Sequence, residues 1–422
     1  MGEFPAACCD KFRNDMANAR WIYKERFCLF PEGVIGILKA YEFRLYPNAE
    51  QQKQLERQLE LLRFVYNKQL EYMIEQYEKE KKSCSYYELN AHLLDLKEQF
   101  PELKEIHSQV LQNVNQRVAW AFKHFFRRVK NKENPGFPRF KGRNRYKSMT
   151  YPQSGFSLDK KLSLSKIGDI SIVMHRKIEG KIKTLTVKKS ATGKWLSFFT
   201  AEKVITKKEK VPHGLIAIDM GLHHFYADSE GGIVDNPRYF RKSEEKLVQA
   251  QRRHSKKKKG SRNRQKSRSK VAKVHETIAN QRKDFLHKES KKLANKRAYI
   301  AIEKLSVQNM LKNKYLAKSI SDASWRQFLL ILACKAEEAG SKILEVNAWG
   351  TSQHCVCGNR VEKTLAVRVH QCDACGLTID RDVMSAMLIK YIALHELPQE
   401  VREVTLGKME IIPVNEPRIS RH

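Results

Sequence analysis

Two short segments of this chain repeat one pattern, in which isoleucines flank an alanine and an acidic residue follows: Ile216-Ala-Ile-Asp219 and Ile300-Ala-Ile-Glu303. Their length and composition indicate β-strands. Because side chains alternate along a strand, each acid lies on the face of its own alanine, and the isoleucines lie on the opposite face. The small alanine leaves space in front of each carboxylate. The pair therefore predicts a sheet that presents two acidic groups at its strand ends.

The segments around this pair follow the order of an RNase H-like α/β layer: strand, hairpin, helix, strand, helix, strand and helix. The patterns predict strands at residues 215–219, 224–227, 232–234, 299–303 and 342–346, and helices at residues 325–339 and 382–394. The chain from His213 onward is thus predicted to form an α/β domain.

The first half of the chain has a different pattern. Strands are predicted at residues 38–46, 171–175, 182–187 and 195–200, and helices from residue 49 and at residues 108–130. We expect the first strand to pair with the later ones in a small barrel, which makes the helical lobe an insertion. Residues 1–37 are weakly patterned. We expect them to be an extension, with translation beginning near Leu38.

A third acid, Asp382, opens the last predicted helix. Three carboxylates from separate segments can hold two Mg²⁺ ions about 3.5 to 4 Å apart, which activate water and stabilise the leaving oxygen in phosphodiester cleavage. Each acid also has an ordinary interpretation. Asp219 can start a turn, Glu303 can be a solvated strand end, and Asp382 can favour a helix N-terminus through the helix dipole. The repeated pattern, beside a strongly basic segment, favours the metal site.

Four of the nine cysteines form two close pairs, Cys355-Val-Cys357 and Cys372-Asp-Ala-Cys375, which indicate a zinc ribbon. The first pair is one residue shorter than usual, and His354 restores the usual gap to Cys357. Two ligand sets remain: the four cysteines, or His354 with Cys357, Cys372 and Cys375. A degenerate finger without metal is a third interpretation. The other cysteines are expected to be ordinary thiols: Cys8, Cys9, Cys28, Cys84 and Cys334.

The chain carries 80 Lys and Arg against 47 Asp and Glu, a formal net charge of +33, which predicts a polyanionic partner. The charge is uneven, because residues 252–273 contain cations and no acid. Such runs are often only solvated surface. This one continues into a helical pattern with one apolar face, which suits binding to a phosphate backbone. The cations are Arg252, Arg253, Lys256, Lys257, Lys258, Lys259, Arg262, Arg264, Lys266, Arg268, Lys270 and Lys273.

A second basic stretch, at residues 137–151, alternates cations with aromatic rings, a pattern that suits unpaired bases or nucleic-acid grooves. For the rings alone, we favour packing of Phe137 and Phe140 into a core. Phe122, Phe125 and Phe126 are predicted to be core as well. The other residues of the stretch that carry the pattern are Arg139, Lys141, Arg143, Arg145, Tyr146 and Tyr151.

The sequence has no feature of a membrane or secreted protein. No apolar run approaches the roughly 18 residues of a membrane span, and residues 1–24 lack the apolar core of a signal peptide. Cysteines grouped as metal ligands favour a reducing compartment. We therefore expect a soluble, cytoplasmic protein.

Motifs spread along the chain carry a family resemblance. They include Lys39-Ala-Tyr-Glu-Phe-Arg-Leu-Tyr-Pro47, Gly214-Leu-Ile-Ala-Ile-Asp-Met-Gly-Leu222, Asn236-Pro-Arg-Tyr-Phe240, His275-Glu-Thr-Ile-Ala-Asn-Gln-Arg282, Ala317-Lys-Ser-Ile-Ser-Asp-Ala-Ser-Trp325 and Asp380-Arg-Asp-Val383. From about Leu38 to about Ala393, the chain resembles the TnpB (OrfB) family of insertion sequences, compact RNA-guided nucleases related to type V CRISPR effectors.

The resemblance implies a multidomain α+β protein. It implies a RuvC-type nuclease domain at residues 211–350 and 378–396, a zinc ribbon at residues 351–377, an oligonucleotide-binding-type barrel at residues 38–48 and 136–210, and a helical recognition lobe at residues 49–135. Residues 1–37 and 397–422 would be an extension and a tail.

Carried over by position, the resemblance implies catalytic acids at Asp219, Glu303 and Asp382, and it selects Asp382 over Asp380 because the family's acid is the second of Asp-Arg-Asp. It implies that the protein binds Mg²⁺, zinc and a guide RNA from the element's own end. It also implies cleavage of guide-matched DNA in one site, by a monomer or by an asymmetric dimer on RNA. The family usually has Asn where this chain has Met384 and Leu388. The alternatives are a nuclease-impaired, RNA-guided DNA-binding repressor and a transposase or its accessory protein.

Overall fold

The computed structural model describes residues 34–81, 84–206, 214–347, 350–364 and 367–397. The chain divides into two compact units at Thr206 and Lys207, and each unit is described by itself. Within the described ranges, no helix is both long enough and apolar enough to cross a membrane.

The first unit contains a seven-stranded antiparallel sheet that forms a nearly closed barrel. Its strands, in spatial order, are β2 (Ser148–Tyr151), β6 (Lys181–Lys189), β7 (Trp195–Thr206), β1 (Val34–Tyr46), β5 (Gly168–Val173), β4 (Lys161–Leu164) and β3 (Phe156–Leu158).

Strand β1 occupies the centre of this sheet, where it pairs with both β7 and β5. The predicted pairing of the first strand with later ones is thus confirmed, and the helices of the unit lie between β1 and β2 in the sequence. The prediction that the strand starts at Leu38 is wrong, because pairing with β7 begins at Val34, opposite Thr206. Residues 1–33 of the predicted extension lie outside the described residues.

Three α-helices and a short 3-10 helix complete the first unit: α1 (Ala49–Glu80), α2 (Tyr86–Gln99), η2 (Pro101–Glu105) and α3 (Ser108–Lys130). Capping boxes fix the starts of α1 and α2, since the side chains of Asn48 and Ser85 each accept the backbone N–H three residues ahead. Sheet and helices share one apolar core, in which Phe43 and Phe199 of the sheet lie with Leu62 of α1.

The second unit contains a five-stranded sheet in the order β10, β9, β8, β11, β12. The strands are β8 (Leu215–Asp219), β9 (His224–Asp228), β10 (Ile233–Asp235), β11 (Tyr299–Glu303) and β12 (Lys342–Val346). Strands β8, β11 and β12 are parallel, and β9 and β10 form an antiparallel hairpin beside β8. Every strand predicted in this half of the chain is present.

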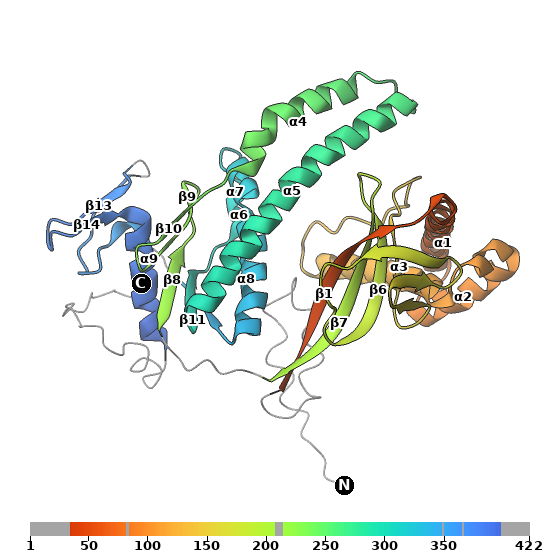
Figure 1. Ribbon diagram of the computed structural model, residues 1–422, viewed down its shortest axis with the longest axis horizontal. Helices are drawn as coiled ribbons and strands as arrows, with labels where there is room; N and C mark the ends of the chain where they lie inside the picture. The colour runs from red at the N-terminus through yellow and green to blue at the C-terminus, as the bar shows by residue number, and fades with distance from the viewer. Residues whose placement is uncertain (1–33, 82–83, 207–213, 348–349, 365–366, 398–422) are drawn as a thin grey trace, which may run out of the picture. The chain divides into compact units, whose positions relative to one another are not determined.

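Helices cover both faces of this sheet (Figure 1). The isoleucines of β8 and β11 pack against α5 (Arg262–Lys296), α7 (Ala317–Ala323) and α8 (Trp325–Ala339). Ala217 and Ala301 lie on the opposite face, which packs against Ile389 and Ala393 of α9 (Arg381–Glu396). The predicted separation of isoleucine and alanine faces is therefore confirmed.

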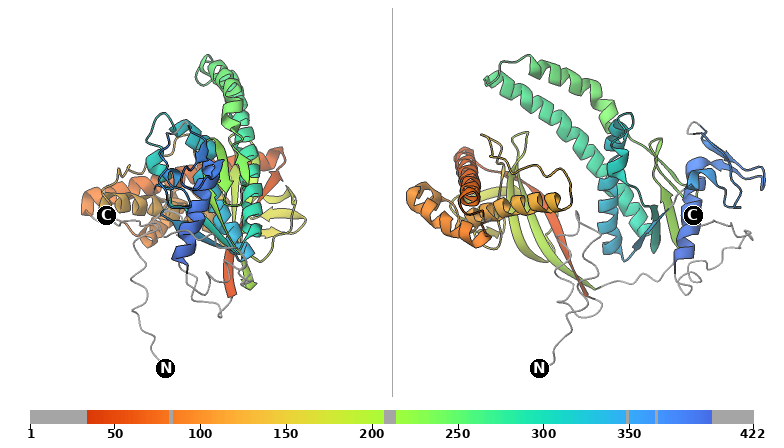
Figure 2. Two further views of the ribbon diagram at one scale, coloured as in Figure 1. Left: turned by 90° about the vertical axis from the view of Figure 1, so that its left-hand side faces the viewer. Right: turned by 180° about the vertical axis from the view of Figure 1, so that it is seen from behind.

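The second unit also contains the helix α4 (Tyr239–Ser255). Four short elements complete its described part: α6 (Val307–Met310), η3 (Thr351–Gln353), β13 (Val369–Gln371) and β14 (Thr378–Asp380). Helices α4 and α5 run side by side away from the sheet, as Figures 1 and 2 both show. The basic run at residues 252–273 lies in this α4–α5 hairpin.

Candidate functional site

Two of the three predicted acids stand at the ends of neighbouring strands. Strands β8 and β11 are parallel and in register, with Ala301 opposite Ala217 and Ile302 opposite Ile218. Asp219 and Glu303 are the last residues of these strands. By strand alternation, both carboxylates lie on the alanine face, which is the face that α9 covers.

The third acid, Asp382, is in the first turn of α9 and is 6% exposed. The N-terminus of α9 is capped by Asp380, whose Oδ1 accepts the backbone N–H groups of Asp382 (2.8 Å) and Val383 (3.3 Å). A Cβ on Gly221, two residues after Asp219, would lie 3.5 Å from Asp382 Oδ2. The capping role is thus filled by Asp380, and Asp382 faces the segment that follows β8.

The electrostatics of the site reflect this convergence. Burial, followed by the negative charges of Asp382 and Glu303, raises the pKa of Asp219 to about 7, against the opposing effects of Arg381 and the Met220 N–H. Burial also raises the pKa of Glu303. Arg381 contacts Asp382 Oδ1 through Nε and Nη2, at 3.4 Å each. Three acids with one guanidinium form a site short of positive charge.

The three carboxylates lie further apart than the thiols of the cysteine cluster. Among the described residues, only the four cysteines bring three or more ligand atoms within 4.8 Å of one another. Mutual repulsion opposes a closer approach of three carboxylates in the absence of a cation.

The raised pKa of Asp219 predicts a pH-dependent stability. A carboxyl group with a folded-state pKa near 7 stabilises the fold fully below its unfolded pKa of about 4, and this contribution is lost as pH rises through 7. In metal-free protein, Asp219→Asn should therefore raise the melting temperature by roughly 5 °C at pH 8 and by little at pH 4. Melting of both proteins at the two pH values tests this. Asp159→Asn, at an exposed acid, should change neither value, and an equal shift at both pH values would contradict the assignment.

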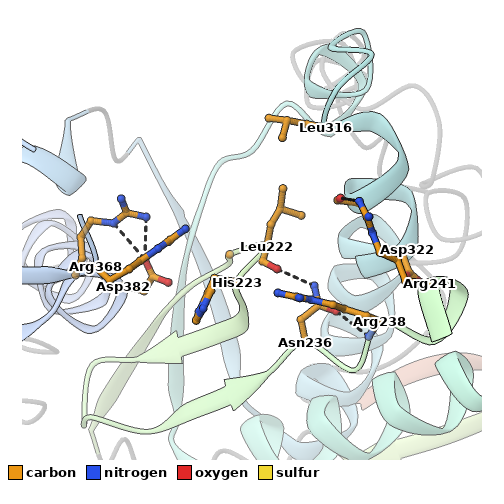
Figure 3. Close-up of a pocket in the computed structure, with 12 residues that line it drawn as sticks. Leu222, His223, Asn236, Arg238, Arg241, Leu316, Asp322, Arg368 and Asp382 are labelled. Carbon is orange, nitrogen blue, oxygen red and sulfur yellow. Dashed lines mark hydrogen bonds and ion pairs between the residues drawn. The ribbon is translucent and has the colours of Figure 1, made fainter. Parts of the chain in front are cut away.

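A pocket of about 620 Å³ adjoins this acidic group and reaches Asp382 and Gly221 (Figure 3). In Figure 3, Arg368 and Asp382 lie on one side of the pocket, and Arg241 and Asp322 lie on the other. The arginines among its lining residues are Arg238, Arg241, Arg368 and Arg381. Sequence reasoning missed all four as site residues, although Arg238 and Arg381 fall inside motifs noted for their family resemblance.

Asp322 lines this pocket and links the helices beside it. Its side chain is 4% exposed, and its carboxylate accepts Nη2 of Arg282 at 3.0 Å. It also accepts the backbone N–H groups of Phe240 (3.0 Å) and Arg241 (3.3 Å) in the first turn of α4. The N-cap residue of α4 makes no side-chain cap, so Asp322 of α7 supplies the cap from outside the helix. One carboxylate thus joins α4, α5 and α7.

The four predicted cysteine ligands converge beside the N-terminal half of α9, where Cys355 and Cys372 pack with Met384 and Leu388. Sγ of Cys355 lies 3.7 Å from Sγ of Cys375, and Sγ of Cys357 lies 3.6 Å from Sγ of Cys372. These separations are too long for a disulfide bond of about 2 Å. They match the edge of about 3.8 Å that follows from tetrahedral geometry with Zn–S bonds of about 2.3 Å. The donor set and its geometry therefore fit zinc.

The shortened first cysteine pair closes a tighter turn than the second pair does. In the second turn, the N–H of Gly376 donates to the carbonyl of Cys372, at 2.8 Å. In the first, the N–H of Gly358 donates to the carbonyl of Cys355 at 2.9 Å, so the loop closes one residue earlier. Gly358 has a φ of 87° and Gly376 has a φ of 75°. Glycine adopts such positive φ values at little cost.

His354 is placed apart from this cluster. Its Nδ1 contacts the carbonyl oxygen of Gly350 at 2.9 Å, and it is not among the converging ligand atoms. The apolar residues Met384 and Leu388 of α9 pack with the buried cysteines Cys355 and Cys372. The two positions where this chain departs from the resembling family thus face the cysteines.

Burial opposes ionisation of the thiols, whereas hydrogen-bond donors around them favour ionisation. At Cys372, burial raises the pKa of the thiol, but the N–H groups of Cys375 and Ala374 together with the thiols of Cys357 and Cys375 lower it more, to about 6. At Cys355, burial dominates and raises the pKa. At least one thiol of the cluster is therefore ready to bind a cation as thiolate near neutral pH.

The basic run forms the tip of the α4–α5 hairpin. It covers the end of α4, a short connection and the first turns of α5, and all its cations except Arg264 are exposed. Arg264 Nη1 donates to the carbonyl oxygen of Lys257 at 2.6 Å, and His254 Nδ1 contacts Ser267 Oγ at 2.9 Å. Arg264 is thus engaged inside the hairpin, and the other cations face solvent.

The aromatic prediction for the first unit is wrong in part. Phe122 is 8% exposed and belongs to the core as predicted, but Phe126 is 44% exposed. Phe137 and Phe140, for which core packing was favoured, are 51% and 55% exposed. The core already contains the rings of the sheet and α1, so these rings remain at the surface. Tyr146 and Tyr151 are buried, and burial raises the pKa of Tyr146.

Three family models match this chain. The model described as "Probable transposase" matches residues 197–314, the model described as "Cas12f1-like, TNB domain" matches residues 325–389, and the model described as "Helix-turn-helix domain" matches residues 37–82. Within residues 37–81 the structure has strand β1 and the single helix α1 in place of two helices.

Relatives match over most of the chain. A "Putative RNA-guided DNA endonuclease" of Streptomyces pristinaespiralis is 35% identical over 360 residues, which are 83% of this chain and 88% of the relative. "Putative RNA-guided DNA endonuclease InsQ" of Escherichia coli is 32% identical over 402 residues, which are 89% of this chain and 98% of the relative. The solved structure of a Cas12f1-sgRNA-target DNA complex matches with a TM-score of 0.32 at 16% identity, over 84% of this chain and 99% of that one. A TM-score of that size establishes no shared fold.

Proposed function

Because this chain belongs to the TnpB (OrfB) family of insertion-sequence proteins, we propose that it is an RNA-guided DNA endonuclease. Its substrate is DNA that pairs with a bound guide RNA, and the bond that it hydrolyses is a phosphodiester. The observation that supports this proposal is that Asp219 and Glu303 end neighbouring strands on the sheet face covered by α9, while Asp382 lies in the first turn of α9.

The three acids would bind Mg²⁺. Carboxylate oxygens are its preferred protein ligands, and the raised pKa of Asp219 marks a cluster of like charges that a cation would relieve. When bound, Mg²⁺ supplies Lewis-acid activation of water and stabilisation of the leaving oxygen. Arg381 neutralises part of the charge at Asp382, and the arginines of the adjoining pocket bind the phosphate groups of the strand being cut.

The sheet order supports an RNase H-like, RuvC-type nuclease domain in the second unit. A hairpin beside the first strand, followed by two parallel strands on its other side, leaves the acid-bearing strand ends in the middle of the sheet. In the first unit, the nearly closed barrel interrupted by α1, α2 and α3 supports an oligonucleotide-binding-type domain with an inserted recognition lobe. The exposed tip of the α4–α5 hairpin suits a nucleic-acid backbone, whose binding weakens as salt rises.

The cysteine cluster would hold one structural zinc ion through Cys355, Cys357, Cys372 and Cys375. We expect purified protein to contain one zinc per chain. Cys372→Ser should lose it, because three thiolates leave the tetrahedral site incomplete, whereas His354→Ala should keep it. Metal analysis of the purified proteins measures both outcomes. Cys334→Ser serves as a control outside the cluster, and loss of zinc from His354→Ala would contradict the four-cysteine set.

The proposed function is tested with the native complex. Protein purified from its host is expected to carry a discrete RNA, which is sequenced and used to design a DNA library with matched targets beside randomised flanks. The complex with Mg²⁺ should cut matched targets and leave mismatched ones intact. Tight binding of matched DNA without any cutting would instead identify a repressor, and joining of DNA ends would identify a transposase.

A further inference from the structure

The loop at residues 136–141 is held rigidly although it has no regular secondary structure. At one end, Arg128 Nη2 donates to the carbonyl oxygen of Gly136 at 3.4 Å. At the other end, the backbone of Lys141 is fixed on both sides. Its N–H donates to Asn67 Oδ1 at 2.7 Å, and its carbonyl oxygen accepts Asn67 Nδ2 and Arg63 Nη1, each at 3.1 Å. The loop is thereby anchored to α1 and α3.

Phe137 fixes the middle of this loop against α3. Its ring meets those of Phe122 and Phe125 edge-to-face, with centroids 5.7 and 5.3 Å apart. Pro138 follows it and restricts the backbone further. A loop anchored at both ends and packed through one ring holds its remaining side chains in nearly fixed positions.

Phe140 is the side chain that this arrangement leaves without a partner. Its ring is 55% exposed, and no ring of another described residue contacts it. An exposed aromatic ring on an anchored loop loses little conformational entropy when a ligand covers it. The position is therefore suited to binding.

The surroundings of Phe140 are cationic. Arg139, Arg143 and Arg145 are all exposed, and residues 134–147 contain no acidic residue. An exposed ring among cations, on a segment without acids, matches the way proteins bind single-stranded nucleic acid, with bases stacked on rings and phosphates near cations. A run of cations without an acid favours a polyanion over a protein partner.

We propose that the loop at residues 136–141 and the segment that follows it to Arg145 form an RNA-binding site, in which Phe140 stacks on an unpaired base and Arg139, Arg143 and Arg145 contact the flanking phosphates. The choice of RNA rests on the proposed function. Bases of duplex DNA are already stacked and paired, whereas loops and ends of a guide RNA offer unpaired bases that can stack on an aromatic side chain.

The test uses full-length protein freed of RNA and a 12-nucleotide single-stranded RNA with one central 2-aminopurine, without Mg²⁺ or DNA. Binding should quench the 2-aminopurine fluorescence through stacking. Phe140→Ala should abolish the quenching and weaken binding by about 5- to 100-fold, with an unchanged slope of log K against log salt. Arg139→Gln should keep the quenching and make that slope shallower by about 0.7.

Three controls separate stacking from a loss of structure. Phe140→Trp should restore binding and quenching, whereas Phe140→Leu, which keeps an apolar side chain, should behave as Phe140→Ala. Tyr87→Ala removes a ring that is 82% exposed on α2 and should leave binding unchanged. Wild-type affinity of Phe140→Ala, an equal loss of affinity for double-stranded RNA, or an effect on self-association alone would each overturn the proposal. RNA binding through Phe140 by a protein that cuts no DNA would contradict only the proposed function.

Discussion

Replacement of Asp219 by alanine should reduce cleavage of guide-matched DNA on the order of 10³-fold or more, because it removes the carboxylate on which the other two acids converge. Asp219 ends β8, beside Glu303 at the end of β11, and both lie on the face that α9 covers. The change removes no cation, so binding of guide RNA and target DNA should stay within about twofold of wild type. Cleavage and binding are measured on the same preparation of complex.

Asp235→Ala is a matched control for this experiment. Asp235 belongs to the same sheet, in β10, but its side chain is 90% exposed and it pairs with His224. We expect it to retain most of the cleavage activity. Activity that survives in Asp219→Ala would show that the reaction occurs elsewhere. Loss of binding together with cleavage would show that the substitution disturbs the fold.

Replacement of Asp322 by alanine should cost about 3 to 5 kcal/mol of the free energy of unfolding of the second unit. The change leaves the guanidinium of Arg282, which is 21% exposed, without its partner. It also leaves the backbone N–H groups of Phe240 and Arg241 without an acceptor. Urea unfolding followed by circular dichroism measures the loss.

The control for Asp322 is an ion pair on α5, the helix that carries its partner Arg282. Asp284 and Lys288 form an ion pair in α5 with side chains 63% and 68% exposed, so Asp284→Ala should change stability little. Asp322→Asn keeps an oxygen acceptor for the N-terminus of α4 and should lose less stability than Asp322→Ala. If Asp322→Ala and Asp284→Ala were equally stable, Asp322 would not join the three helices.

The local elements of the second unit were predictable because their patterns are local. Each strand is short and apolar, and the alternation in Ile216-Ala-Ile-Asp219 decides the face of its acid without any tertiary information. By contrast, β3 and β4 in the first unit were missed because they are three or four residues long, with polar residues between leucines. Helix α2 was missed although Ser85 and Glu88 form a capping box before Leu89, Leu93 and Leu96.

Contacts between distant segments could not be predicted in the same way. The acids were found because two of them end a strand pattern and Asp382 opens a helical one, but the pocket arginines Arg241 and Arg368 have no pattern that links them across the sequence. Asp322 caps α4 from a helix some 80 residues further along the chain, since its partners Phe240 and Arg241 lie 82 and 81 residues away. Phe140 is exposed because other side chains occupy the core. The local sequence around Phe140 does not indicate this.

The α4–α5 hairpin has a thermodynamic consequence for the protein without nucleic acid. Its long arm, α5, has 35 residues and extends about 50 Å. Leu247 is the buried residue of α4, so little apolar surface holds the tip together. Neighbouring cations there repel one another with no acid in the run to offset them. Helix formation at the tip should therefore be coupled to counterions, and a polyanion that binds the folded arm would raise its melting temperature further as the polyanion concentration rises above its dissociation constant.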